Sequence, residues 1–303
     1  MTVVSVGTWA RDEDNPVYPV GANPKRLLVC PPQPPSADLI AGHRYLFKTA
    51  KGWKAGQLWS EYLAFELSAP TGVHVPRCFV AVDEKTGESG ALVEFFYGYP
   101  GDVPGLRFTH GSDITQSVII DKKKGRPHSI PYNVRLCRRY GINDSESWWG
   151  QVLAFDAFIG DTDRHPDNWG MLVRLGAAPQ YAMAPAFDNG TSLAYEIPED
   201  RLPGLKDQNW FDRYVARGTH HAGWSLKGNE GMPHFEMCTK FLEAYPAAGA
   251  AMRNVILCGE SHTGKVLASC TAVDVPNGLS QKRADFLAKL LATRHRELER
   301  VLS

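Results

Sequence analysis

The segment GDTDRHPDNWG at residues 160–170 holds three aspartates, one asparagine, one arginine and one histidine in eleven residues. It directly follows the apolar run VLAFDAFI, which has the spacing of a buried helix. About twenty residues later, the apolar stretch YAMAPAFDNGTSL contains a second polar group, Asp188 and Asn189. Because functional side chains are often placed where a rigid element ends, the two segments predict one oxygen-rich site.

The residue types of this site suit metal-assisted phosphoryl transfer. Asn168 and Asp188 offer hard oxygen ligands of the kind that Mg²⁺ takes while it shares its shell with phosphates and water. Asp163 is then the carboxylate that can accept a hydroxyl proton. The alternative is a turn whose Asp and Asn side chains only satisfy backbone donors. An EF-hand and a zinc site do not fit, because the spacing lacks a central Gly and a closing Glu, and His165 has no companion ligand.

Phosphoryl transfer from a nucleotide also needs a cation for the phosphates and an acid that holds this cation. Lys48 lies in the predicted strand HRYLFKTA, and Glu61 follows thirteen residues later in the predicted helix GQLWSEYLAFELSAPTG. A strand lysine paired with a helical glutamate is the arrangement found in kinases. Glu66 competes with Glu61, but five residues turn a helix by about 140°, so only one of the two can face Lys48. For Lys48 itself, an isolated surface lysine is the alternative.

A glycine-rich phosphate loop of the usual form is missing, since neither GxGxxG nor GxxxxGK[ST] occurs in the sequence. The segment VGANPKRLLV at residues 20–29 offers a substitute. In it, Gly21 permits a close backbone approach and Lys25 supplies charge just before a strand. An ordinary turn is an equally good interpretation of this segment.

Hydrophobic periodicity predicts a β-rich first part and a mainly helical second part. The expected strands are KRLLVC, HRYLFKTA, VHVPRCFVAV and GALVEFFYG, with one helix, GQLWSEYLAFELSAPTG, among them. From about residue 130 we expect the helix DSESWWGQVLAFDAFIG, a helix or helix pair interrupted at Pro246, and the helix SQKRADFLAKLLATRHRELERVL capped by Ser280. These elements predict an α+β, two-lobed, protein-kinase-like fold with an N-lobe at 1–97, a C-lobe at 98–303 and a hinge near 94–101, together one domain.

Composition limits the partners and the compartment. Lys and Arg number 33, as do Asp and Glu, so the formal net charge of zero favours neither nucleic acid nor membrane insertion. No apolar stretch reaches the ~18 to 20 residues of a membrane span, no signal peptide is evident, and the six cysteines form no CxxC pair. We therefore expect a cytoplasmic protein with reduced cysteines. The run at 122–124, KKK, is expected to be a solvated loop. The Gly- and His-rich segment 216–235 is expected to be a surface loop, with the acceptor side of the site as its alternative.

Taken in order, the motifs GANPK, YLFK, SEYLA, LVEFF, DTDRHPDN and APAFDNG resemble the HipA-like serine/threonine kinases. They are more distantly similar to the phosphatidylinositol 3- and 4-kinases, which also use a D-R-H-x-x-N loop. The resemblance implies ATP and Mg²⁺ as cofactors, Asp163 as catalytic base, Asn168 and Asp188 as metal ligands, and Lys48 on the ATP phosphates. The other implied nucleotide-site residues are Gly21, Ala22, Asn23 and Lys25 in the phosphate loop, Glu61 beside Lys48, Glu94 and Phe96 at the adenine, and His165 bracing the catalytic loop.

Some features depart from this family. Asp161 stands where members often have Asn, and Tyr18, Pro19 and Val20 stand directly before Gly21, where some members have a serine that they autophosphorylate. The chain also starts almost directly at the phosphate loop, so an antitoxin partner is not implied. We expect a kinase that uses ATP to phosphorylate serine or threonine of a protein substrate. The alternatives are a lipid or small-molecule kinase of the same fold, adenylyl transfer, and a pseudokinase or nucleotide-binding module, which would not need Asp163.

Overall fold

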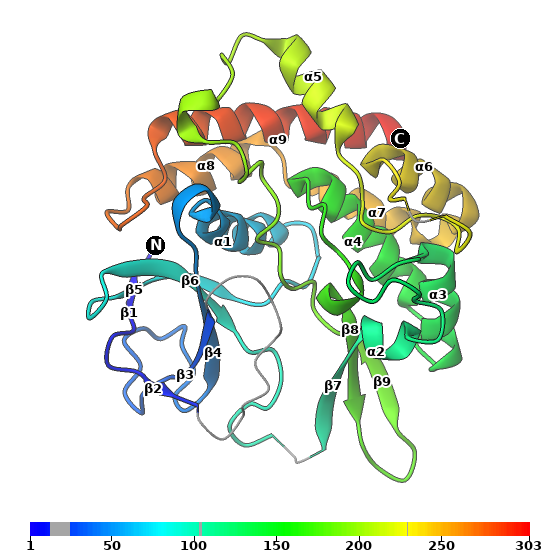
Figure 1. Ribbon diagram of the computed structural model, residues 1–303, viewed down its shortest axis with the longest axis horizontal. Helices are drawn as coiled ribbons and strands as arrows, with labels where there is room; N and C mark the ends of the chain where they lie inside the picture. Colours follow the sequence, from blue (N-terminus) through cyan, green and yellow to red (C-terminus); the bar gives the residue numbers. More distant parts are fainter. Residues whose placement is uncertain (13–24, 103–104, 229) are drawn as a thin grey trace.

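The computed structural model describes residues 1–12, 25–102, 105–228 and 230–303, and it has two parts (Figure 1). The first part is a six-stranded sheet with the order β1-β5-β6-β4-β3-β2, antiparallel except where β1 pairs with β5. Its strands are β1 (Val4–Ser5), β2 (Ala10–Arg11), β3 (Lys25–Val29), β4 (Arg44–Thr49), β5 (Cys78–Asp83) and β6 (Glu88–Glu94). The four predicted strands are therefore confirmed, while β1 and β2 are too short to produce a pattern in the sequence.

The helix α1 (Gln57–Ser68) joins the sheet to the helical part of the molecule. In β6, Leu92 packs on the outer face of the sheet together with Phe47, whereas Ala91 and Val93 face α1. The other side of α1 contacts α8 (Glu260–Thr271). Since α1 is buried between sheet and helices, its side chains are placed by both parts at once. Figure 1 shows α1 in this position, above the sheet and below α8.

The helix α4 (Ser145–Ile159) is the centre of the helical part. It contacts α3 (Ile130–Arg139), α6 (His234–Ala244), α7 (Gly249–Asn254) and α9 (Gln281–Leu302). Its Gly150 permits this close packing, because a Cβ there would lie within 2.9 to 3.0 Å of side-chain atoms of α6, α7 and the 3-10 turn between them. Such a helix is apolar on nearly all sides, as the sequence of α4 predicted. It ends at Gly160, whose φ of 72° is the left-handed conformation that favours glycine.

The other predicted helices are confirmed in outline. The segment around Pro246 is a pair, α6 and α7, rather than one helix. The hydroxyl of Ser280 accepts a hydrogen bond from the backbone N–H of Arg283 at 3.0 Å, so it caps α9 as expected. Two further helices, α2 (Gly111–Thr115) and α5 (Gln208–Arg217), complete the set in the described ranges. Of these helices, none combines the length and the apolar character needed to span a bilayer.

A second sheet, with the order β7-β8-β9, was not predicted from the sequence. Its strands are β7 (Leu106–His110), β8 (Gly170–Arg174) and β9 (Gln180–Met183). Met171 of β8 pairs with Met183 of β9, so this hairpin leaves the 160–170 segment and returns the chain beside it. The hairpin is therefore the element that brings the two polar segments of the sequence together.

Candidate active site

A cavity of about 400 Å³ lies where the first sheet, α1 and the polar loop after α4 meet. Its wall combines side chains from four separate stretches of the chain. The sheet contributes Lys25 and Lys48, α1 contributes Glu61, the loop contributes Asp163, His165 and Asn168, and the segment after β9 contributes Asp188 and Thr191. Most of the residues predicted to do chemistry therefore surround one space.

Lys48 is held between two carboxylates at the back of this cavity. Its Nζ lies 2.5 Å from Oε1 of Glu61 and 2.8 Å from Oδ1 of Asp188. Burial alone would lower the pKa of the Lys48 ammonium, but the charges of Asp188 and Glu61 raise it above its ordinary value. The buried cation is therefore permanent. The ammonium of Lys48 pairs with the carboxylate of Glu61, whereas Glu66 lines a different pocket beside Tyr62.

Asp188 is positioned by its backbone as well as by Lys48. Its φ of 59° lies in the left-handed region, which is uncommon for a residue with a side chain. The next residue, Asn189, donates its backbone N–H to Oε2 of Glu61 at 3.3 Å. Burial alone would raise the pKa of the Asp188 carboxyl, but the ammonium of Lys48 holds it well below its usual range. A negative charge is thus fixed in the cavity at neutral pH.

Asp163 is held less tightly than its neighbours, and its carboxylate is 43% exposed. Oδ2 lies 3.5 Å from the hydroxyl of Thr191, and Oδ1 lies 4.0 Å from Nε2 of His165. Burial raises the pKa of this carboxyl, with an opposing contribution from His165. Asn168 donates its side-chain N–H to the backbone oxygen of Asp163 at 2.8 Å, so its amide oxygen remains available to a ligand. The site therefore has one exposed carboxylate beside an amide side chain that lines the cavity.

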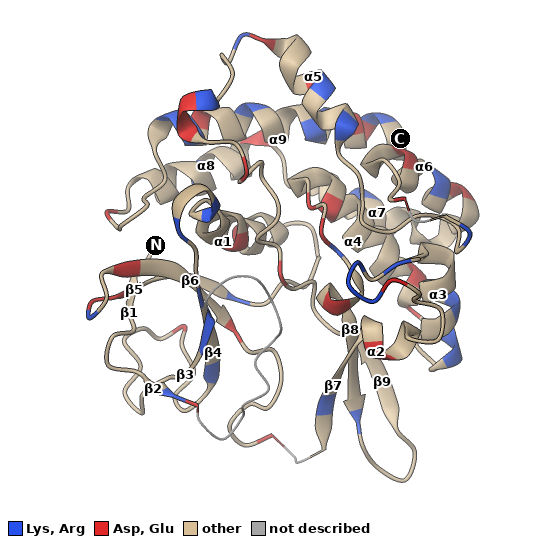
Figure 2. Cartoon of the chain, viewed as in Figure 1, with Lys and Arg blue, Asp and Glu red and all other residues tan. Residues whose placement is uncertain are grey.

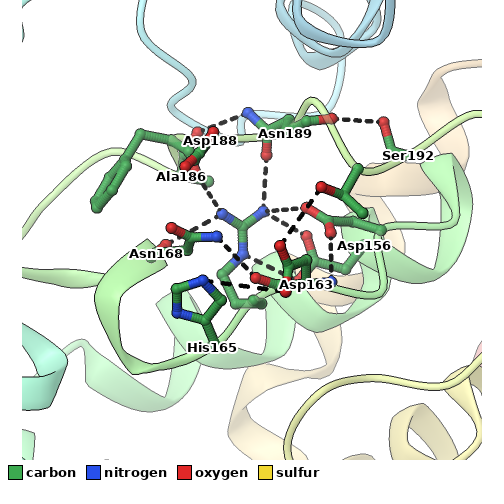
Figure 3. A network of polar contacts seen from close by, with 12 residues as sticks. Asp156, Asp163, His165, Asn168, Ala186, Asp188, Asn189 and Ser192 are labelled. Atoms are coloured by element: carbon green, nitrogen blue, oxygen red, sulfur yellow. Dashed lines mark hydrogen bonds and ion pairs between the residues drawn. The ribbon is translucent and has the colours of Figure 1, made fainter. Parts of the chain in front are cut away.

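Arg164 holds the loop through a buried network of polar contacts, which Figure 3 shows in close-up. Its guanidinium is 3% exposed, and the carboxylates of Asp156 and Asp161 are fully buried around it at 2.7 and 3.2 Å. It also donates to Oδ1 of Asn189 at 2.7 Å and to the backbone oxygen of Phe187 at 2.5 Å. One side chain thus ties together α4, the loop at 160–168 and the segment that carries Asp188.

A second buried layer lies behind this network and holds Asp161 in place. Nε2 of His234, on α6, lies 2.8 Å from the backbone oxygen of Asp161. Arg294, on α9, donates to the backbone oxygen of Ala157 at 2.9 Å. Burial lowers the pKa of His234 well below its ordinary value, so this imidazole is neutral and donates one N–H to the loop. α6 is therefore hydrogen-bonded to the loop at Asp161, and α9 is hydrogen-bonded to the last turn of α4.

Arg164 and Asp156 were not predicted as site residues, and Asn189 was noted only as the neighbour of Asp188. A signal was present, because Asp156 is the one charged residue in the apolar run VLAFDAFI. A buried carboxylate needs a cation, and the nearest arginine along the chain is Arg164. The sequence therefore contained the information needed to predict a buried ion pair between Asp156 and Arg164.

The remaining predicted residues are placed as follows. Gly21, Ala22 and Asn23 lie outside the described residues. Lys25 of β3 lies opposite Lys48 of β4 in the strand register, and it lines the cavity. Burial lowers the pKa of Lys25, and the charge of Asp188 opposes this shift. Glu94 and Phe96 are not among the described residues that line the cavity. Glu94 accepts a hydrogen bond from the hydroxyl of Tyr99 at 2.5 Å, and Phe96 packs against Phe108 and Phe187.

Comparison with known families gives a match over most of the chain. The model of the HipA-like C-terminal domain matches residues 19–247. The chain belongs to this family. The resemblance that the sequence motifs indicated is therefore confirmed at the level of the family. Curated protein sequences give no significant match to this HipA-like chain.

Two solved structures share the fold of the HipA-like chain. The Helicobacter pylori proinflammatory kinase CtkA matches with a TM-score of 0.72 and 13% identity, over 99% of this chain and 97% of that chain. HipA, from the Shewanella oneidensis MR-1 toxin–antitoxin complex with HipB and operator DNA, matches with a TM-score of 0.56 and 12% identity, over 96% of this chain and 66% of that chain. The predicted two-lobed, kinase-like α+β fold is confirmed, and the chain is a kinase-like protein.

Proposed function

We propose that this protein uses ATP and Mg²⁺ to phosphorylate a serine or threonine hydroxyl of a protein substrate. One observation carries the proposal. Lys48, paired with Glu61 of α1, lines the same cavity as the exposed carboxylate of Asp163 and the side chain of Asn168. A protein that only bound a nucleotide would need the cation but not the exposed carboxylate of Asp163.

The N-lobe, proposed as residues 1–97, would hold the nucleotide phosphates. Lys48 and Lys25 lie side by side on adjacent strands and both line the cavity, so two positive charges can meet the polyphosphate. Glu61 holds the Lys48 ammonium in one place, which limits the reorganisation that binding requires. The charges of the nucleotide would thus be balanced by fixed groups.

The C-lobe, proposed as residues 98–303, would supply the metal ligands and the base. Asn168 can offer its amide oxygen and Asp188 its carboxylate, which fits Mg²⁺ and its preference for oxygen and for few protein ligands. When bound, Mg²⁺ would neutralise part of the phosphate charge. Asp163 would accept the proton of the acceptor hydroxyl, and His165 and Thr191 would orient its two oxygens. Arg164 is a positioning residue, because it touches the loop and not the cavity.

The test is mass spectrometry of a protein pool incubated with Mg-ATP and purified enzyme. Wild type is compared with Asp163→Ala and with the matched control Asp212→Ala, which changes an exposed aspartate on α5. We expect phosphate on serine or threonine from wild type and Asp212→Ala, and none from Asp163→Ala. Additions of AMP would instead establish adenylyl transfer, and the absence of ATP binding in a thermal-shift assay would refute a nucleotide-dependent function altogether.

A further inference from the structure

We propose that a basic groove beside Asp163 receives the acceptor and selects protein hydroxyls that are flanked by acidic residues. The inference rests on the proposed kinase function and adds the class of its substrate. The groove has a volume of about 410 Å³. Its lining consists of Lys123, Lys124, Gly125, Arg126, Asp163, His165, Asp167 and His221.

The position of the groove identifies it as the acceptor side. Asp163 and His165 line both this groove and the cavity that contains Lys48, and the two spaces share no other described residue. In phosphoryl transfer, the attacking and leaving oxygens lie on opposite sides of the transferred group, and the base lies next to the attacking hydroxyl. If the nucleotide occupies the Lys48 cavity, the hydroxyl must approach Asp163 from the other space that this carboxylate borders.

The basic turn, residues 121–126, is built against the catalytic loop and is not a free loop. The backbones of Asp121 and Arg126 exchange two hydrogen bonds, at 2.8 and 3.0 Å. The backbone oxygen of Lys124 lies 2.9 Å from Nε2 of His221. Gly125 has a φ of 60°, and a Cβ there would lie 2.7 Å from Cδ of Pro166. The turn thus packs on the loop that carries Asp163, which places its cations at a fixed side of the groove.

The cations that line the groove form no ion pair with any residue that the structure describes. Among the described residues, no carboxylate lies within ion-pair distance of Lys123, Lys124 or Arg126. Figure 2 shows this turn as a blue loop near the middle of the molecule, above α2. Burial lowers the pKa of Arg126, and the more distant charge of Glu230 opposes this. Burial also lowers the pKa of His221 to about 4, so this ring supports the turn as a neutral group.

The arrangement of charge favours an acidic protein segment over a compact anion. The groove is negative on the side of the catalytic loop, at Asp163 and Asp167, and positive on the side of the basic turn. A compact polyanion would bring its charge close to both carboxylates. In a protein segment, a neutral hydroxyl can reach Asp163 while an acidic side chain one or more residues away reaches the cations. An extended chain covers about 3.3 to 3.6 Å per residue, so the two groups can contact opposite sides of the groove.

The experiment compares three short peptides of equal length with one central serine, flanked by glutamate, alanine or lysine. The enzymes are wild type, K123E/K124E, and K206E/K265E as the matched control, which makes the same change of net charge at exposed lysines outside the groove and outside the basic turn. Each exposed ion pair contributes a factor of up to about five. We therefore expect wild type to prefer the acidic peptide by about tenfold in kcat/KM.

The variants separate charge recognition from a structural effect. We expect K123E/K124E to lose about tenfold on the acidic peptide through KM, with kcat little changed, and to gain on the lysine peptide. K206E/K265E should stay within about twofold of wild type. Equal kcat/KM values on all three peptides, or a K123E/K124E variant with the kcat/KM values of wild type, would refute the proposed role of the groove. Either result would leave the proposed kinase function intact. Transfer of phosphate only to phosphatidylinositol in vesicles would refute the proposal that the acceptor is a protein. Failure to bind ATP would refute both proposals.

Discussion

Replacing Arg164 with methionine would leave two buried carboxylates without their cation. The guanidinium lies 2.7 Å from Asp156 and 3.2 Å from Asp161, and all three side chains are almost completely removed from solvent. Methionine keeps much of the length of the arginine stem, so the change removes the charge and its hydrogen bonds rather than the packing. The same change breaks the contacts to Asn189 and to the backbone of Phe187, which place Asp188.

The cost follows from the burial of this network. Removing one partner of a buried ion pair destabilises a protein by about 3 to 5 kcal/mol, because the other charge stays unpaired. A domain typically has a free energy of unfolding of about 5 to 15 kcal/mol, so Arg164→Met removes a large part of it. Burial already raises the pKa values of Asp156 and Asp161, and Arg164 opposes that rise. Without the arginine, both carboxyls bind protons more readily in the folded state than in the unfolded state.

The sign of the pH dependence follows from this. A carboxyl with a raised pKa in the folded state contributes stability when it is protonated, and this contribution is lost as the pH rises through the raised pKa. The difference between wild type and Arg164→Met should therefore be larger at pH 7 than at pH 5. Urea unfolding, followed by the fluorescence of buried Trp149 and Trp169, measures it at both values.

A matched control separates burial from the loss of an arginine as such. Arg138 pairs with Glu146 on the surface and is 50% exposed, so Arg138→Met should change the free energy of unfolding by less than about 1 kcal/mol. An Arg164→Met protein within about 1 kcal/mol of wild type at pH 7 would refute the reasoning. It would mean that the network adapts to the loss of its central cation.

Three further predictions follow from the site and the core. Lys48→Met should abolish the ATP-induced thermal shift and reduce phosphoryl transfer at least about a hundredfold, whereas Glu66→Gln should leave both near wild type. The single-turnover rate should rise with pH along the titration of Asp163, with a midpoint above the ordinary aspartate value because burial raises its pKa, and a flat rate from pH 4 to 7 would contradict Asp163 as base. Gly150→Val should lower the free energy of unfolding by about 1 to 3 kcal/mol through overpacking, whereas Gly264→Ala, in a helix with open space around it, should raise it by about 0.5 kcal/mol.

Local patterns in the sequence determined most of the elements. Helices such as α4 and α9 and strands such as β4 and β6 are long enough for the period of their apolar residues to be visible. The sheet β7-β8-β9 was missed because its strands are only four or five residues long and their side chains are mostly half exposed. Their stability comes from pairing between distant segments, and a pattern within one segment does not reveal a partner.

For the site, the sequence determined the kinds of groups and the tertiary structure decided their relations. Lys48, Asp163, Asn168 and Asp188 could be singled out because these residue types recur in phosphoryl transfer and each follows or ends a predicted element. Their convergence on one cavity depends on packing between residues up to 140 positions apart.

The choice between Glu61 and Glu66 required the actual rotation of α1 on the sheet, which packing on both sides of the helix sets. The role of Arg164 required knowing that it is buried, and the basic turn beside Asp163 required a contact between residues 125 and 166. Burial and long-range contact arise only when the whole chain is packed, because both depend on side chains far away in the sequence. The sequence by itself therefore determined which kinds of chemical groups the protein carries, and only the tertiary structure decided which charges meet and which line the cavity.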